Sequence, residues 1–178
     1  MIRRIALFIL AVMFCVPLLG LNGCTKKEKD PDRFYSSIYG FSIKFPQGWQ
    51  TTQDKDTVVS ALSPFEDDQD ILQEAVGVIA QNHYLPILLD DWFASVRSEA
   101  RETILRYREI ETGQMVIGDI NLKWIKRSYF DDIGEIVDKS YCFVKGNRGY
   151  IISCNSQPDK FSKYEKLFEE SVKTFRFE

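Results

Sequence analysis

YGFSIKFPQGW, residues 39–49, carries the strongest structural signal in this chain. Its apolar residues Phe41, Ile43 and Phe45 alternate with polar ones, which predicts a β-strand with one buried face. The dipeptide Tyr39-Gly40 before the strand and the segment 46–49 after it have the composition of turns. This short strand is therefore expected to be an early strand of the β-sheet of a globular domain.

The rest of the sheet is predicted from apolar runs farther along the chain. These runs are 57–62, 75–80, 120–129, 135–144 and 149–154, with strand signals resuming at Tyr107. Asp132-Ile133-Gly134 and Gly146-Asn147-Arg148-Gly149 separate the last three runs, and turns of this kind predict antiparallel hairpins. The first two runs are separated by an acidic loop, residues 64–70.

Two segments have helical spacing instead. Between residues 88 and 105 the recurring apolar positions are Leu89, Trp92, Phe93, Val96, Ala100 and Ile104. After Pro158 and Asp159, a second stripe consists of Phe161, Tyr164, Phe168, Val172 and Phe175. Helices this amphipathic bury one face against a sheet. The expected fold class is α/β (α+β), a mostly antiparallel sheet flanked by two main helices in an αβα sandwich.

Three segments together resemble a known family. The stretch at 39–49, the run Gly149-Tyr150-Ile151-Ile152-Ser153-Cys154 and the final helix from Phe161 to Phe175 with Arg176-Phe177 look like the PsbP-like fold, named for an extrinsic subunit of photosystem II. The resemblance covers nearly the whole domain, and it implies an architecture and not an activity. Bacterial relatives of this kind are often small envelope lipoproteins of unknown role. Phe45 and Trp49 match the opening motif, and we interpret them as core and turn residues.

The N-terminus resembles a bacterial lipoprotein signal. Arg3 and Arg4 precede an apolar stretch from Ile5 to Leu19, which is too short for a membrane-spanning helix, and Leu21-Asn22-Gly23-Cys24 resembles a lipobox. The expected organisation is a signal peptide at 1–23, a lipidated Cys24 with a flexible tether at 24–33, and a PsbP-like domain at 34–178. The alternatives are an ordinary secretory signal with a chance cysteine and an uncleaved N-terminal anchor.

Lipid on Cys24 would attach the protein to a membrane of the cell envelope. Thr25, in place of Asp, follows the cysteine. Under the sorting rule of many bacteria this favours the outer membrane, facing the periplasm. The formal charge of the chain is −3, and removal of Arg3 and Arg4 makes it −5. An acidic domain of this kind is a poor candidate for binding nucleic acid through its phosphates.

Cys142 and Cys154 are the two cysteines that remain in the domain. They lie on neighbouring candidate strands, in a compartment that is expected to be oxidising. A disulfide requires both side chains to lie on the same face of the hairpin, and the alternation of Cys142 with Tyr141 and Phe143 points it away from the face of Cys154. Two interpretations therefore stay open, a disulfide between the two cysteines or two small buried thiols.

Residues for catalysis are scarce. The only histidine is His83, which we interpret as a surface or strand-end residue, and the chain has no CxxC, HExxH, GxSxG or phosphate-binding loop. Glu66, Asp68 and Asp70 are candidate ligands for a hard cation, although a solvated acidic loop is the preferred interpretation. Lys123, Lys126 and Arg127 are interpreted as the solvent face of a half-buried strand. No enzyme activity, cofactor or metal site is therefore predicted.

The functional prediction is a membrane-anchored envelope lipoprotein whose non-enzymatic domain binds another envelope protein and helps it assemble. One alternative is a carrier of a small ligand or cation in the envelope. A second alternative is an unrecognised hydrolase.

Overall fold

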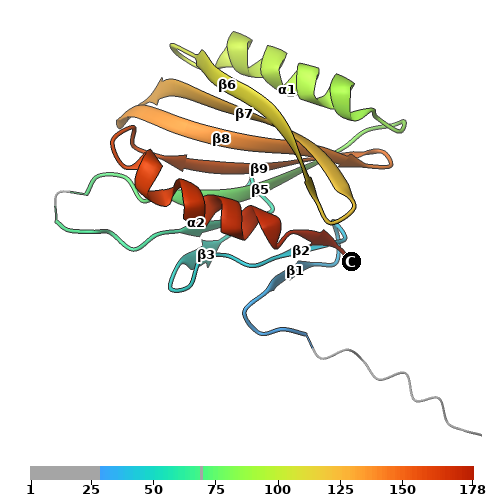
Figure 1. Cartoon of the computed structure of the whole chain (residues 1–178), viewed down its shortest axis with the longest axis horizontal. Helices are drawn as coiled ribbons and strands as arrows, with labels where there is room; N and C mark the ends of the chain where they lie inside the picture. Colours follow the sequence, from blue (N-terminus) through green and yellow to red (C-terminus); the bar gives the residue numbers. More distant parts are fainter. Residues whose placement is uncertain (1–28, 69) are drawn as a thin grey trace, which may run out of the picture.

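The computed structural model describes residues 29–68 and 70–178 (Figure 1). Its helices are α1 (Leu89–Thr103) and α2 (Phe161–Lys173). Its strands are β1 (Phe34–Ser36), β2 (Phe41–Ile43), β3 (Gln50–Thr52), β4 (Val59–Leu62), β5 (Ala75–Asn82), β6 (Arg108–Ile117), β7 (Ile120–Asp131), β8 (Gly134–Lys145), β9 (Arg148–Ser156) and β10 (Arg176–Phe177). The large sheet has the order β3-β4-β5-β9-β8-β7-β6, and a small sheet has the order β1-β2-β10.

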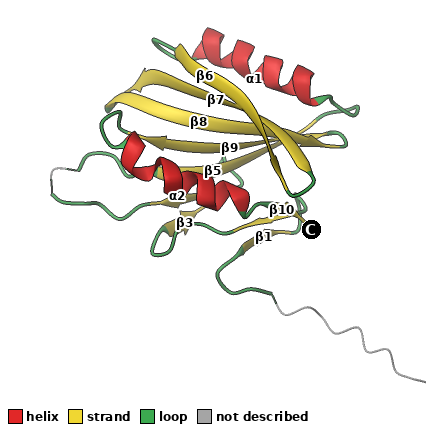
Figure 2. Ribbon diagram, in the orientation of Figure 1, coloured by secondary structure: helices red, strands yellow, loops and turns green. Residues whose placement is uncertain are grey.

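The two helices cover opposite faces of the large sheet (Figure 2). Phe161, Phe168 and Val172 of α2 pack in one core cluster with Tyr141 and Phe143 of β8. On the other face, α1 forms a second cluster, which contains Trp92, Phe93, Val96, Ile125 and Cys142. Every strand pair in the described residues is antiparallel. The predicted α+β sandwich, with one helix on each face, is confirmed.

The stretch at 39–49 forms the middle of the small sheet. Phe41 and Ile43 of β2 are fully buried, and the Phe41 ring stacks on Phe175 at 5.2 Å between centroids. The strand has β1 on one side and the C-terminal β10 on the other, so that Ser42 is buried as well. Trp49 follows in a turn and makes edge contacts with Tyr164 and Phe168 of α2. The interpretation of Trp49 as a core and turn residue is confirmed.

The predicted solvent face of β7 is wrong, because the three basic residues do not share a face. Lys126 points toward α2, where it lies over the Phe161 ring and pairs with Glu165. Arg127 points toward the other face, where its side chain is only 11% exposed and pairs with the buried Asp138 at 2.9 Å. Lys123 pairs with Asp90 of α1. Strand residues alternate between faces, so neighbours such as Lys126 and Arg127 must diverge.

Trp92 fixes the position of α1 on the sheet. Its indole packs against Gly149, where an added Cβ would be 2.5 Å from the ring, and its Nε1 donates a hydrogen bond to the Tyr150 carbonyl oxygen. Position 149 therefore requires glycine, because the Trp92 indole lies too close to leave room for a Cβ.

We expect Gly149→Ala to lower the free energy of unfolding by about 1–3 kcal/mol, because the buried indole must move. Urea unfolding measures the change. Gly118→Ala is unsuitable as a control because Gly118 has positive φ, so Ser98→Ala on the exposed side of α1 serves instead. Equal stability of Gly149→Ala and the control would contradict the close packing of Trp92.

Glu109 of β6, the edge strand of the large sheet, forms ion pairs with α1. Its carboxylate accepts two hydrogen bonds from Arg97, at 3.0 and 2.6 Å, and pairs with Arg101 at 2.9 Å. The hydrogen bonds from Arg97 outweigh burial and lower the pKa of Glu109 from its usual 4.5 to about 2.

A depressed carboxylate pKa stabilises the fold above the unfolded-state value, and this contribution is lost as the pH falls. The stability contributed by Glu109 should therefore be complete above pH 4.5 and disappear as the pH approaches about 2. Comparing unfolding free energies of the wild type and Glu109→Gln across this range tests the assignment. The difference in unfolding free energy between the two proteins should shrink as the pH falls. A difference that is independent of pH would contradict the role assigned to Glu109.

Candidate functional site

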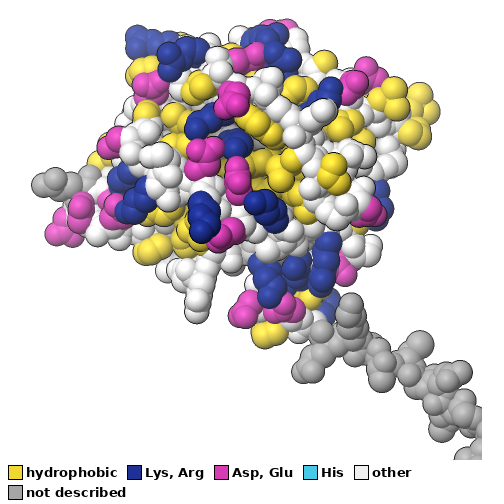
Figure 3. Space-filling view, viewed as in Figure 1, with side chains coloured by type: hydrophobic (Ala, Val, Ile, Leu, Met, Phe, Trp, Pro, Cys, Tyr) yellow, Lys and Arg dark blue, Asp and Glu magenta, His cyan; other side chains and the backbone are white. Residues whose placement is uncertain are grey.

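The loop between β5 and α1 exposes three large hydrophobic side chains within five residues. Tyr84, Leu85 and Leu88 have relative exposures of 106%, 75% and 71%. Figure 3 shows hydrophobic side chains at the end of the domain where Figure 1 places this loop. We call residues 83–88 the tip loop. Single exposed apolar residues are common, whereas three within five residues make this loop a candidate binding surface.

The tip loop is hydrogen-bonded at both of its ends to the β8–β9 turn. The His83 N–H donates to the Asn147 carbonyl oxygen at 2.8 Å, and Asn147 Nδ2 donates back to the His83 carbonyl oxygen at 2.8 Å. The Ile87 N–H donates to Gly146 at 3.2 Å, and the Ile87 side chain packs on the α1 cluster. A preformed loop loses little conformational entropy on binding, which favours affinity.

His83 directly follows β5, as predicted for a strand-end residue. Its ring packs edge-on against Trp92 at 5.3 Å between centroids, and its Nε2 is buried without a hydrogen-bond partner among the described residues. The contact with Trp92 packs His83, the first residue of the tip loop, against α1.

The acidic loop forms ion pairs with lysines at the N-terminal end of α2. Asp70 pairs with Lys160 at 2.7 Å, and Glu66 pairs with Lys163 at 2.6 Å. The hydrogen bond from Lys163 is the main reason that the pKa of Glu66 is lowered. The structure thus brings Glu66 and Asp70 together and leaves Asp68 exposed at the turn between them. Both paired carboxylates join the loop to the helix, and the described residues contain no group of three or more acidic, Cys or His side chains arranged for a metal.

Cys142 and Cys154 are both buried free thiols, so the candidate disulfide does not form. The β8–β9 register explains this result. Cys142 lies opposite Ile151, and Cys154 lies opposite Lys139, which places the two sulfurs in different core clusters. Burial raises the pKa of the Cys142 thiol to about 12, which makes it unreactive at neutral pH.

Cys24, the predicted lipidation site, lies outside the described residues. Within them, no helix is both long and apolar enough to cross a membrane. Residues 29–33 of the predicted tether are described, and they contact the domain. Asp30 pairs with Lys44 at 2.6 Å, and Arg33 donates to the Thr174 carbonyl oxygen at 2.8 Å.

Neither the tip loop nor the buried Arg127–Asp138 pair was predicted from the sequence. A signal for the loop exists in Tyr84-Leu85-Pro86-Ile87-Leu88, where apolar residues surround a proline without strand or helix periodicity. A signal for the pair exists in the alternation of β7, which places Arg127 on the same face as the buried Ile125. Neither signal gives the partner residue.

Comparison with known proteins relates the fold to solved structures. No family model and no curated protein matches the sequence. The cyanobacterial PsbP, CyanoP from Synechocystis, is similar with a TM-score of 0.60 and 15% identity over 82% of this chain and 91% of that one.

Two further structures resemble the chain. LpqN of Mycobacterium tuberculosis, described as involved in cell envelope biogenesis, has a TM-score of 0.61 and 8% identity over 76% of this chain and 81% of that one. The Saccharomyces cerevisiae Ran-binding protein Mog1p has a TM-score of 0.55 and 11% identity over 82% of this chain and 94% of that one. At these identities the likeness concerns the fold alone. The chain therefore has a PsbP-like α+β fold, as its sequence predicted.

Proposed function

We propose that this protein is an envelope lipoprotein, anchored through lipid on Cys24, whose domain binds another envelope protein through the tip loop without catalysing a reaction. The exposure of Tyr84, Leu85 and Leu88 on a preformed loop is the observation that carries this proposal. Aromatic and large apolar side chains of this kind form the energetic centre of protein interfaces. The partner is expected to present an apolar cleft that receives them.

The sequence and the comparisons support this proposal in different ways. The lipobox-like segment before Cys24 supports the anchor, and Thr25 supports an outer-membrane location facing the periplasm. Two anchored proteins meet at a higher effective concentration than two free ones, so that even a small interface can suffice. LpqN is involved in cell envelope biogenesis and Mog1p is a Ran-binding protein, which agrees with a binding role in the envelope.

We expect Leu85→Ser to abolish partner binding while the unfolding free energy changes by less than about 0.5 kcal/mol, because Leu85 is exposed. Binding is measured by cross-linking in cells and mass spectrometry of the detergent-solubilised complex. Lys166→Ser on the outer face of α2 is the matched control, since its side chain is 88% exposed. A partner recovered equally with Leu85→Ser and the control would refute the tip loop as its binding surface.

A further inference from the structure

A cavity of about 530 Å³, with a lining of both charged and apolar residues, opens beside the small sheet. Lys29 and Arg176 supply two positive charges to its lining, and Asp30 and Glu178 supply two negative charges. The buried ring of Phe41 and the half-buried ring of Phe177 add an apolar floor. The volume lies in the range of small-molecule sites, and the mixture of charges suits a ligand that itself carries both signs.

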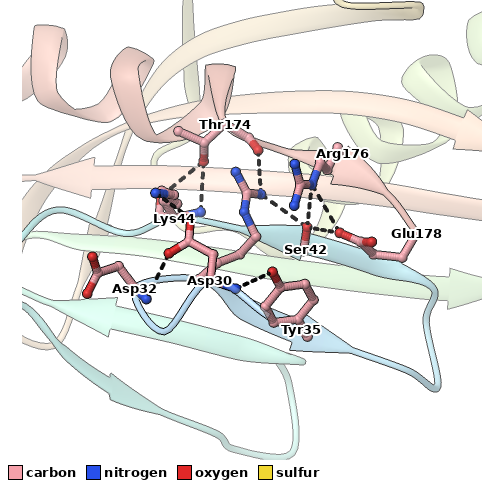
Figure 4. Close-up of polar contacts among 9 residues, drawn as sticks. Asp30, Asp32, Tyr35, Ser42, Lys44, Thr174, Arg176 and Glu178 are labelled. Carbon is pink, nitrogen blue, oxygen red and sulfur yellow. Dashed lines mark hydrogen bonds and ion pairs between the residues drawn. The ribbon is translucent and has the colours of Figure 1, made fainter. Parts of the chain in front are cut away.

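The charged side chains of this cavity are held in place by the strands (Figure 4). Arg176 Nε donates to Ser42 Oγ at 3.2 Å and to Glu178 Oε1 at 3.1 Å. The hydrogen bond to Glu178 is the main cause of the raised pKa of Arg176. On the other side, Lys44 fixes the carboxylate of Asp30. Lys29 lies over the Tyr35 ring at 4.9 Å.

The path of the chain places this cavity close to the anchor. Asp30 and Arg33 are bonded to the domain, and Lys29, the first described residue, directly precedes them. Cys24 lies five positions before Lys29 in the sequence. Even fully extended, these five steps span at most about 18 Å. Lipid on Cys24 would therefore hold the small sheet within about 18 Å of the membrane surface. In Figure 3, basic and acidic side chains gather where the chain joins the domain.

Ile38 adds an apolar contact at the same end. It lies in the β1–β2 turn, next to the cavity-lining Ser37, and is 79% exposed. An exposed aliphatic residue beside charged groups suits the boundary between lipid headgroups and acyl chains.

We propose that the face formed by β1, β2 and β10 rests on the membrane, with a zwitterionic phospholipid headgroup in the cavity. The headgroup phosphate meets Lys29 and Arg176, its ammonium group meets Asp30 and Glu178, and Ile38 enters the lipid surface. This inference rests on the lipidation of Cys24 in the proposed function. Figure 1 places α1 on the side of the domain away from β1, so this orientation leaves α1 facing away from the lipid.

The test uses the mature lipidated protein in vesicles of phosphatidylethanolamine and phosphatidylglycerol. A fluorophore is attached to Ser37→Cys at the cavity rim or to Lys166→Cys on the outer face of α2. Both positions are exposed, and the native Cys142 and Cys154 are buried. Iodide in the water quenches exposed labels, and a nitroxide on the lipid headgroup quenches labels at the membrane. Flotation of the vesicles measures anchoring separately.

We expect iodide quenching of the label at position 37 to be several-fold weaker than at position 166, with strong quenching by the nitroxide lipid. Lys29→Glu should restore iodide quenching at position 37 without changing flotation, because the lipid still anchors the protein. Equal iodide quenching at both positions in floating protein would overturn the membrane-facing assignment alone. Protection only in vesicles of pure phosphatidylglycerol would overturn the zwitterionic ligand. Absence of flotation in the wild type would refute the anchor and, with it, the proposed function.

Discussion

Replacing Asp138 by alanine will lower the free energy of unfolding by about 3–5 kcal/mol, the usual cost of removing one partner of a buried ion pair. Asp138 lies in the middle of β8 and is fully buried. It accepts a hydrogen bond from Arg127 Nε at 2.9 Å and others from Ser140 Oγ and Ser153 Oγ. Without the carboxylate, the Arg127 guanidinium would stay buried without its counter-charge. Urea unfolding of the wild type and the variant measures the loss.

A double variant separates the contribution of the charge pair to the unfolding free energy from the contribution of packing. Arg127→Met with Asp138→Leu removes both charges and keeps the space filled, so it should be more stable than Asp138→Ala alone. Ser153→Ala removes one hydroxyl donor and should cost only about 1 kcal/mol. If Asp138→Ala lost less than about 1 kcal/mol, the pair would not be the buried, compensated ion pair described above.

Replacing Cys24 by alanine will move the protein completely from the membrane fraction to the soluble envelope fraction. The thiol is the acceptor of the proposed lipid, and several acyl chains give attachment that a surface contact cannot replace. Membrane fractionation and mass measurement of the intact protein report attachment and lipid separately. Cys15→Ala, within the predicted signal, is the control and should leave the mature protein lipidated. A Cys24→Ala protein that remains in the membrane fraction at the mass of the cleaved chain would contradict the lipid anchor, whereas the mass of the uncleaved chain would show retention through the signal.

Local sequence patterns predicted most of the fold. The alternation of Phe41, Ile43 and Phe45 and the helical stripe from Phe161 to Phe175 both depend on neighbours along the chain, so they can be read without a structure. The turn at Asp131 is also local, because Asp131 Oδ1 accepts the N–H groups of Ile133 and Gly134.

The remaining features depend on pairing between distant residues. Alternation already separated Cys142 from the face of Cys154, but only the register that places Cys142 opposite Ile151 excludes the disulfide. Likewise, Arg127 could be assigned to the face of Ile125, whereas its pairing with Asp138 follows from the β7–β8 register. The tip loop is apolar in sequence, and its exposure is decided by the hairpin that supports it, 64 residues away at Asn147.

Photo-cross-linking from position 84 tests the central claim most directly. A photoreactive amino acid replaces Tyr84 in the anchored protein in cells, and the same amino acid at Lys166 is the control, since both side chains are exposed. We expect one recurrent envelope protein, cross-linked from position 84 and absent from position 166, whose yield falls when Leu85→Ser is added. The same products from both positions, unaffected by Leu85→Ser, would contradict a protein-binding role of the tip loop.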